Sequence, residues 1–394
     1  MEGRKFTGSM ALVLALLLLQ ATTMCLAWNT DGHTVICNLA RPLITPAAMV
    51  QVNNLMNSQF QHNFSTLCTW GEEVQYLPQY SWSPPLHSVN TPDKLCNYNY
   101  TRDCIGVFGE PNFCASGAVK NYTSQLVDPN SQYNKTEALL FMSNILGDIH
   151  QPLRCGFIGD GGGSFIEVWW MNTQNGSRTD LFSVWDSIMT HAAYERYYNQ
   201  SNPTFNETLV DILGNMSLSI YSNLTTADVS AWSPCPAGPA SCPDIYVTES
   251  VQLACQYAYA GVTSNQILTD EYFTTGLPVV EKRLLQAGVR LAATLNRIFD
   301  PTYVSPPLAP APGIPGPTPP LPPVSAPAVS PVPSAPLNAS APPPPASPAA
   351  TPTAPAPSVV SPAAHVPATP GPVVSVPTDP VLGTPILTPL PSMG

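Results

Sequence analysis

This sequence has few charged residues, and basic residues are the scarcest. Lys and Arg together number 14 against 25 Asp and Glu, so the formal net charge of the 394 residues is −11. It also lacks any run of basic side chains, the usual sign of a general attraction to polyanions. Binding of a nucleic acid would therefore need another local source of positive charge, such as a metal cluster.

Long apolar runs are missing beyond the first residues. No later segment is apolar and long enough to span a bilayer, and the last residues lack the apolar tail of a lipid-anchor signal. The start of the chain has Arg4 and Lys5, then an apolar run over 10–19, and ends with small residues up to Ala27. This order is typical of a secretory signal peptide, so we expect residues 1–27 to be removed and the protein to be secreted.

Residues 304–394 lack Lys and Arg altogether, and Asp379 is their only acidic residue. Pro, Ala, Ser, Thr and Val dominate them, a composition that cannot bury a core and favours polyproline II. We expect a folded domain over 28–303 and a disordered Pro-rich tail over 304–394. The Ala-Pro, Ser-Pro and Thr-Pro runs resemble the hydroxyproline-glycosylated modules of plant and algal wall proteins. The tail either tethers the domain to cell-wall polysaccharide or is an inert extension.

Cleavage after Ala27 would give Trp28 a free α-amine. A new N-terminus can chelate a metal ion through its amine nitrogen and its own carbonyl oxygen. His33, five residues on, supplies an imidazole suited to zinc. The alternative is that Trp28 is only the first residue of the mature core.

Other segments carry side chains that can bind metals. His87 precedes a turn. Asn144 and Asp148 are four residues apart, as are Phe182 and Asp186, so each pair shares one face of an expected helix.

Helical spacing of apolar residues predicts most of the folded domain. The helix that carries residue 186 is expected to run into residue 198, and a second helix is expected over 246–260. The spacing over 271–297 predicts a long C-terminal helix with Leu284, Leu285, Val289, Leu291, Leu295 and Ile298 facing the core.

Taken in order from Trp28 to Asp186, the metal-binding residues resemble those of the S1/P1 nuclease family. Residues 249–255 and 277–299 are most similar to the plant bifunctional endonucleases. The resemblance implies a mainly α fold, a single disulfide-stapled helical domain of the S1/P1 nuclease (phospholipase C-like) type. It further implies a secreted phosphodiesterase with three zinc ions at the bottom of a cleft, which cuts single-stranded DNA and RNA and often removes 3'-phosphates.

The family pattern has nine metal-binding positions, and four of them differ in this sequence. The positions that keep the expected residue are Trp28, His33, His87, Asp148 and Asp186. The replacements are Glu72 for an Asp, and Asn144, Arg154 and Phe182 each for a His.

By this resemblance, the lost ligands are spread unevenly over the three metal positions. The ligands of one ion would be Trp28, His33 and Asp148. The ligands of a second would be Glu72, His87, Asn144 and Asp148, with Asn144 offering an amide oxygen. We expect these two zinc ions to remain, bridged by Asp148, and to activate the attacking water for catalysis.

The third ion would have only Asp186 beside Arg154 and Phe182, and we expect no zinc there. Two interpretations of Arg154 stay open. Its guanidinium either clamps a phosphate as a catalytic group or pairs with Asp186 in place of the missing ion.

The residues implied in substrate binding are also altered. The position after His87 is usually aromatic in the family and stacks a base, but here it is Ser88. Asn90 is expected to contact the base edge. A glycine loop over 160–164 ends in Ser164, where the family usually has Asn.

The ten cysteines indicate an oxidising compartment, and nine remain after removal of the signal peptide. By resemblance the disulfides join Cys37 to Cys68, Cys96 to Cys255, Cys104 to Cys114, and Cys235 to Cys242. Cys155 is left over, either as a buried apolar residue or as a soft metal ligand. Asn-x-Ser/Thr glycosylation sites occur at Asn63, Asn99, Asn121, Asn134, Asn175, Asn206, Asn215, Asn223 and Asn338.

Two functions follow as hypotheses. The first is a secreted, monomeric, zinc-dependent endonuclease that hydrolyses single-stranded DNA and RNA or nucleotides, with 3'-nucleotidase activity and a reduced two-metal core. The alternative is a catalytically inactive, nuclease-like glycoprotein of the cell wall or extracellular matrix.

Overall fold

The computed structural model describes residues 28–60, 63–171, 177–198, 209–235 and 240–306. They all belong to the first of two compact units, Met1–Thr318. The predicted signal peptide and nearly all of the predicted tail lie outside the described residues, so both remain predictions.

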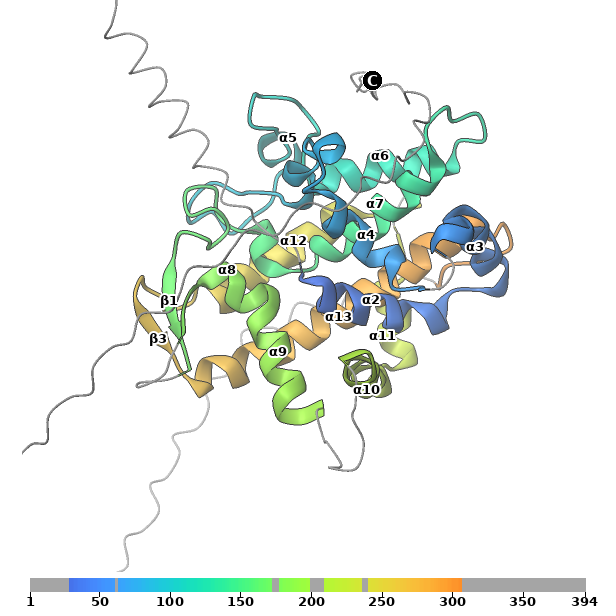
Figure 1. Ribbon diagram of the computed structural model, residues 1–394. Helices are drawn as coiled ribbons and strands as arrows, with labels where there is room; N and C mark the ends of the chain where they lie inside the picture. Colours follow the sequence, from blue (N-terminus) through green and yellow to red (C-terminus); the bar gives the residue numbers. More distant parts are fainter. Residues whose placement is uncertain (1–27, 61–62, 172–176, 199–208, 236–239, 307–394) are drawn as a thin grey trace, which may run out of the picture. The chain divides into compact units, whose positions relative to one another are not determined.

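Helices make up most of the described chain (Figure 1), which confirms the mainly α prediction. The α-helices are α2 (Thr30–Ala40), α3 (Pro46–Phe60), α4 (Thr66–Val74), α5 (Tyr100–Asp103), α6 (Ala115–Val127), α7 (Lys135–Asp148), α8 (Leu181–Ser183), α9 (Met189–Ala193), α10 (Leu209–Ser222), α11 (Thr226–Trp232), α12 (Pro243–Leu253) and α13 (Asp270–Phe299). Short 3₁₀ turns are η1 (Arg41–Leu43), η2 (Pro78–Tyr80), η3 (Pro84–His87) and η4 (Pro152–Cys155). Three π turns are η5 (Val184–Ile188), η6 (Tyr194–Tyr198) and η7 (Ala254–Ala258).

The C-terminal helix α13 lies where the sequence predicted it. Five of the six residues expected to face the core are buried, and Ile298 packs partly against the core. The helix packs on α2, α3 and α7, and Figure 1 shows it crossing the domain beneath α2. Because an isolated helix is only marginally stable in water, this apolar contact rather than helix propensity holds α13 in place.

The helix expected to run into residue 198 is present, but it is not regular. It consists of α8, η5, α9 and η6 in succession, so π turns interrupt the α geometry twice. The first π turn contains Asp186, one of the expected metal ligands. Such bulges are frequent at functional sites because they change the direction of one side chain. Sequence spacing did not indicate this feature.

A small sheet, not predicted from the sequence, leads into this segment. Its strands are β1 (Glu167–Trp170), β2 (Ser177–Asp180) and β3 (Gln266–Leu268), in the order β2-β1-β3. The pairing of β1 with β2 is antiparallel and that with β3 is parallel. Asp180, the last residue of β2, accepts the backbone N–H of Ser183 and so caps α8.

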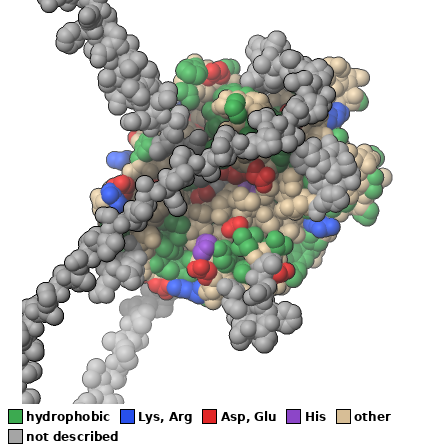
Figure 2. Space-filling view, viewed as in Figure 1, with side chains coloured by type: hydrophobic (Ala, Val, Ile, Leu, Met, Phe, Trp, Pro, Cys, Tyr) green, Lys and Arg blue, Asp and Glu red, His purple; other side chains and the backbone are tan. Residues whose placement is uncertain are grey.

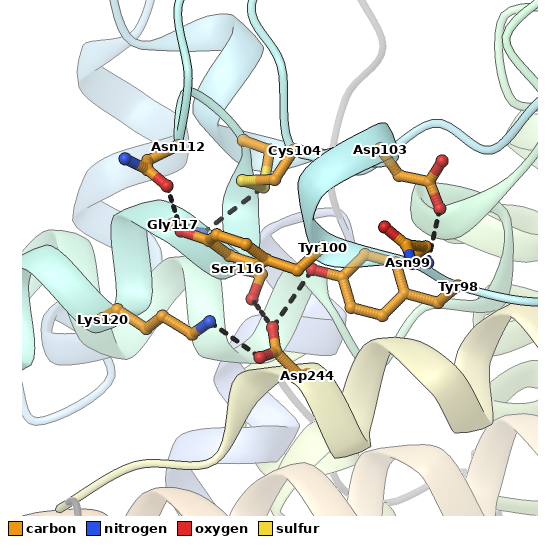
Figure 3. The surroundings of a disulfide bond; sticks show 11 residues. Tyr98, Asn99, Tyr100, Asp103, Cys104, Asn112, Ser116, Gly117, Lys120 and Asp244 are labelled. Atoms are coloured by element: carbon orange, nitrogen blue, oxygen red, sulfur yellow. Dashed lines mark hydrogen bonds and ion pairs between the residues drawn. A yellow bond between two sulfur atoms is a disulfide. The ribbon is translucent and has the colours of Figure 1, made fainter. Parts of the chain in front are cut away.

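Four disulfides join the described cysteines, and they connect the same pairs that the family resemblance implies. Figure 3 shows the surroundings of Cys104–Cys114, which closes the loop between α5 and α6. Nearby, Asp244 at the start of α12 accepts hydrogen bonds from Ser116 at 2.6 Å and Lys120 at 2.7 Å, both on α6. These contacts fix α12 against α6.

Six of the nine predicted glycosylation sites fall within the described residues. Asn63, Asn99, Asn134, Asn215 and Asn223 are exposed, and Asn121 is half-buried. Asn175, Asn206 and Asn338 lie outside the described part of the chain. Among the helices that the structure describes, none is both long and apolar enough to cross a membrane.

Candidate metal centre

A buried carboxylate, Asp148, lies between two imidazoles. Its Oδ1 is 3.2 Å from Nε2 of His33, and its Oδ2 is 2.7 Å from Nδ1 of His87. All three side chains are fully buried. Burial alone would raise the pKa of Asp148, but the charges and hydrogen bonds of His87 and His33 outweigh it and lower this pKa well below its usual range.

Three separate elements bring these side chains together. Asp148 is the last residue of α7, His33 lies on α2, and His87 ends the turn η3. Gly147 permits the close approach of α2 to α7, because a Cβ there would lie 2.9 Å from the His33 ring. The sequence therefore places a glycine next to the carboxylate that both imidazoles contact.

Glu72, on α4, is a second buried carboxylate near this group. Its Oε2 has no hydrogen-bond partner among the described residues. Burial is the main cause that raises the pKa of Glu72, and the positive charge of Arg154 opposes it. A buried carboxylate oxygen without a donor costs free energy, so this atom is suited to binding a cation.

Trp28 lies at the edge of the same group. It is fully buried, and its ring packs against Gly32 in the first turn of α2. The N–H of Asn29 donates to the backbone carbonyl of Asp186 at 3.4 Å, while its side chain caps α2. The backbone that follows the N-terminal residue of the predicted mature chain therefore contacts the segment of Asp186.

Asn144 precedes Asp148 by one helical turn, and its amide nitrogen faces the group. Nδ2 donates to the carbonyl of Cys68 at 2.7 Å and lies 3.3 Å from Nε2 of His33. Its Oδ1 has no partner within the described chain. A Cβ on Gly71 would lie 2.6 Å from that oxygen, so Gly71 leaves the space that this amide orientation needs.

Arg154 and Phe182 contact each other, and Gln151, which caps the turn of Arg154, also donates to Asp186 at 3.5 Å. Arg154 is 1% exposed, and its guanidinium carbon is 4.9 Å from the centroid of the Phe182 ring. Burial raises the pKa of Asp186 well above its usual value, and the charge of Arg154 is the largest influence that lowers it. A Phe ring cannot bind a metal ion, and a guanidinium repels one.

The expected substrate residues lie next to Arg154 through the backbone. The N–H of Val89, between Ser88 and Asn90, donates to the carbonyl of Arg154 at 2.8 Å. Ser88 and Asn90 are both half-buried. The glycine loop over 160–164 uses its amides internally, since the N–H groups of residues 161–164 all donate to acceptors within 157–161. This loop is therefore not arranged to hold a phosphate through backbone amides.

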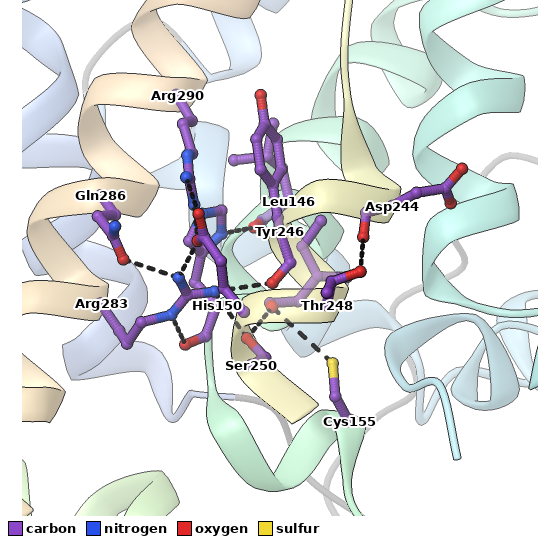
Figure 4. Close-up of polar contacts among 12 residues, drawn as sticks. Leu146, His150, Cys155, Asp244, Tyr246, Thr248, Ser250, Arg283, Gln286 and Arg290 are labelled. Atoms are coloured by element: carbon purple, nitrogen blue, oxygen red, sulfur yellow. Dashed lines mark hydrogen bonds and ion pairs between the residues drawn. The ribbon is translucent and has the colours of Figure 1, made fainter. Parts of the chain in front are cut away.

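Sequence reasoning missed a polar network that holds the end of α7 (Figure 4). Arg283 and Arg290, on one face of α13, both donate to Glu249 of α12. Arg283 also donates to the backbone carbonyl of His150, and Arg290 donates to Nε2 of that histidine. Burial, followed by the charges of the two arginines, lowers the pKa of His150 well below its usual value. Two arginines seven residues apart on a helix were the only signal in the sequence.

Cys155 follows Arg154 and is buried as a free thiol, which supports the interpretation as a buried apolar residue. Burial raises the pKa of Cys155 to about 12, so without a metal ion the thiol stays protonated at neutral pH.

Figure 2 shows acidic side chains near the middle of the viewed face, with basic side chains scattered around its edge. No three His, Cys, Asp or Glu side chains of the described chain come close enough together to hold a metal ion as they stand. The contacts with Asp148 involve two imidazoles on opposite oxygens, so each possible ion position there needs a further donor.

Comparison with known proteins relates this chain to nucleases. The sequence model of S1/P1 Nuclease matches residues 28–300. The chain is 43% identical to Endonuclease 3 of Arabidopsis thaliana over 296 residues, which covers 74% of this chain and 95% of that protein. It is 41% identical to Endonuclease 2 of Arabidopsis thaliana over 308 residues, which covers 76% of this chain and 100% of that protein. It is 28% identical to Nuclease S1 of Aspergillus oryzae over 293 residues, which covers 72% of this chain and 97% of that protein.

Proposed function

We propose, from the premise that this chain belongs to the S1/P1 nuclease family, that it is a secreted hydrolase of phosphodiester bonds in single-stranded DNA and RNA. The observation that carries the proposal is the position of Asp148. Each of its oxygens faces a different buried imidazole, which is the arrangement required of a carboxylate that bridges two metal ions.

The donor chemistry fits zinc at two positions beside Asp148. One position would use the Trp28 amine and carbonyl with His33, and the other would use Glu72 with His87. The buried Oε2 of Glu72, which lacks a partner in the described residues, supports the second position. Asn144 would serve there only if its amide turned, because Nδ2 now faces the group.

The third position does not fit a metal ion. It offers one carboxylate, Asp186, beside a guanidinium and a phenyl ring. We therefore derive no step from an ion at this position. The proposed cofactor is two zinc ions, fewer than the three that the family resemblance implies.

When bound beside Asp148, the two ions supply a water of lowered pKa and positive charge next to the phosphate. Asp148 holds both imidazoles in orientation through its two oxygens. On the side of Asp186, Arg154 is buried against Phe182, so its charge would act on the leaving oxygen only from a distance and would not bind the phosphate. Loss of one stabilising donor typically slows such a reaction by about 10²–10³-fold, so we expect a slow enzyme.

Weak binding of the substrate is part of this proposal. Ser88 provides no ring on which a base could stack, and Asn90 provides only a polar contact to its edge. The net charge of −11 adds no general attraction for a polyanion. The substrates would therefore be flexible single strands, or nucleotides cleaved at the 3'-phosphate, that can reach the buried ions.

The alternative is an inactive glycoprotein with a nuclease fold. It is favoured by the absence, in the described chain, of three metal-binding side chains that converge as they stand. Both functions share the proposed location, which rests on the predicted signal peptide, the four disulfides and the exposed glycosylation sites. On either function, the tail over 304–394 would either tether the domain to cell-wall polysaccharide or be an inert extension, and the domain would be a monomer.

Metal content decides between the two functions. The secreted, processed protein is analysed by inductively coupled plasma mass spectrometry, and the same sample is assayed on single-stranded DNA and RNA before and after chelation. About two zinc ions per chain, with activity that chelation removes and zinc restores, would support the nuclease. One ion or none, with no activity, would leave the inactive glycoprotein. A variant with one extra residue ahead of Trp28 is the matched control, since it blocks only the terminal amine.

A further inference from the structure

Arg154 is a buried cation among buried acids. It is 1% exposed and lies in the turn η4, whose first N–H groups are held by the side chain of Gln151. Nε2 of the same Gln151 donates to Oδ1 of buried Asp186 at 3.5 Å. Gln151 therefore links the turn that carries Arg154 to the remaining carboxylate of the third metal position.

Phe182 fixes the position of that guanidinium. The Arg154 side chain lies over the Phe182 ring at 4.9 Å from its centroid, and the ring is 4% exposed. A cation over an aromatic face is attracted to the ring, and more strongly when both are shielded from water. The two residues that replace imidazoles, Arg154 and Phe182, therefore contact and stabilise each other.

The backbone of the glycine loop over 160–164 packs against the segments of Arg154 and Phe182. A Cβ on Gly162 would lie 2.6 Å from the carbonyl oxygen of Leu153 and 3.9 Å from Cδ2 of Phe182. A Cβ on Gly163 would lie 3.3 Å from the backbone nitrogen of Phe182, and the carbonyl of Gly163 accepts that N–H. The backbone of the loop packs directly on the segments that carry Arg154 and Phe182.

The burial of the guanidinium separates the two interpretations of Arg154. Arg154 is 1% exposed and its guanidinium lies over the Phe182 ring, so a phosphate from solvent has little access to it. A buried cation next to a buried carboxylate such as Asp186 is instead a counter-charge. The arrangement therefore favours a counter-charge over a phosphate clamp.

We propose that Arg154, stacked on Phe182, is a resident cation that permanently replaces the third metal ion, so that the chain holds no more than two ions at any metal concentration. This inference rests on family membership and refers to the same centre as the proposed function. Unlike the proposed function, it concerns only the side of Asp186. It therefore does not depend on catalysis at the Asp148 side.

The test is to restore the two imidazoles and count the ions. We compare the wild type with the double variant Arg154→His/Phe182→His at saturating zinc, measuring zinc per chain after removal of free metal. The expected result is one more ion per chain in the double variant than in the wild type, with a zinc-dependent rise in melting temperature that exceeds that of the wild type. An equal count in the two proteins, or three ions in the wild type, would overturn the proposal.

The matched control is a second Arg–Phe pair in the same chain. The guanidinium carbon of Arg41 lies 5.2 Å from the centroid of the Phe64 ring, but Arg41 is exposed. The variant Arg41→His/Phe64→His introduces the same two imidazoles at a stacked pair elsewhere. It should gain no ion relative to the wild type, and a gain there would mean that added histidines alone explain the count.

Single substitutions keep the proposal testable if the double variant fails to fold. Arg154→Gln removes the charge and should lower the melting temperature by roughly 5–10 °C, because it leaves buried Asp186 without its cation. Arg154→Lys keeps the charge and should recover most of that loss. A melting temperature for Arg154→Gln equal to that of the wild type would contradict the proposal. If the wild type holds no zinc and cleaves nothing, the proposed function fails, yet a gain of one ion in the double variant would still support the resident cation.

Discussion

Glu249 offers the sharpest test of how the centre is held in place. This carboxylate of α12 accepts hydrogen bonds from Nη1 of Arg283 at 2.6 Å and from Nη1 and Nη2 of Arg290 at 2.6 and 2.7 Å. Both arginines also contact His150, two residues beyond Asp148. The substitution Glu249→Gln keeps the shape of the side chain but leaves two buried guanidinium groups without a counter-charge.

The size of the effect follows from this loss of charge. Removing one partner of a buried ion pair costs about 3–5 kcal/mol, and the 33% exposure of the Glu249 side chain favours the lower end. For a domain of this size, roughly 3 kcal/mol corresponds to a fall in melting temperature of about 6–12 °C. Thermal unfolding followed by circular dichroism at about pH 7 measures it directly.

The dependence on pH gives a second, independent check. Burial would raise the pKa of Glu249, but Arg290 and Arg283 lower it from 4.5 to about 2. Because the pKa in the folded state lies below that in the unfolded state, the stabilisation is complete above about pH 4.5 and is lost as the pH falls toward 2. The difference between the wild type and Glu249→Gln should therefore narrow as the pH falls from about 4.5 toward about 2.

An exposed ion pair supplies the control for this experiment. Glu167 and Arg178 form a contact on the surface of β1 and β2 with both side chains about half exposed. Glu167→Gln should change stability by less than about 1 kcal/mol. If Glu249→Gln melts within about 2 °C of the wild type, or if its deficit does not change with pH, the account of the network is wrong.

Three further predictions concern the centre and its surroundings. Asp148→Asn should abolish zinc binding and cleavage together, because it removes the charge that both imidazoles contact; zinc retained at the wild-type level would argue against a bridging role. Ser88→Phe should tighten binding of single-stranded DNA by roughly 5–150-fold, as expected for one added stacking contact, and fluorescence anisotropy would reveal it; unchanged affinity would place the base elsewhere. Stability of the wild type should fall as the pH drops below about 6.5, because burial and two arginines hold His150 neutral in the fold while it takes up a proton when unfolded. His150→Gln should flatten that part of the pH profile in circular dichroism melts, and a profile as steep as the wild type's would assign it to other groups.

Much of the fold was open to prediction from the sequence. The helix over 270–299 repeats apolar residues at helical spacing, and family resemblance supplied the disulfide pairs and the identity of the family. The π turn over 184–188 was not predictable, because a single extra residue in a helix leaves apolar spacing almost unchanged. The sheet was missed for another reason: β1 pairs with β3 about a hundred residues away, and both strands are very short.

In the metal centre too, residue types could be predicted from the sequence, whereas features that depend on distant residues could not. The residue types at the nine metal-binding positions could be read from the sequence. The orientation of Asn144 could not, because it depends on the carbonyl of Cys68 and on the space left by Gly71. The stacking of Arg154 on Phe182 likewise depends on two turns that only the fold brings together.

The two sides of the centre differ in how they accommodate lost imidazoles. On the side of Asp186, the guanidinium of Arg154 and the ring of Phe182 occupy two expected ligand positions and contact each other. On the side of Asp148, Oε2 of Glu72 is buried without a hydrogen-bond partner in the described residues. Such an atom costs about 1–3 kcal/mol, and a cation bound between Asp148 and Glu72 would remove much of that cost. We therefore predict that zinc stabilises the wild type through the Asp148 side alone.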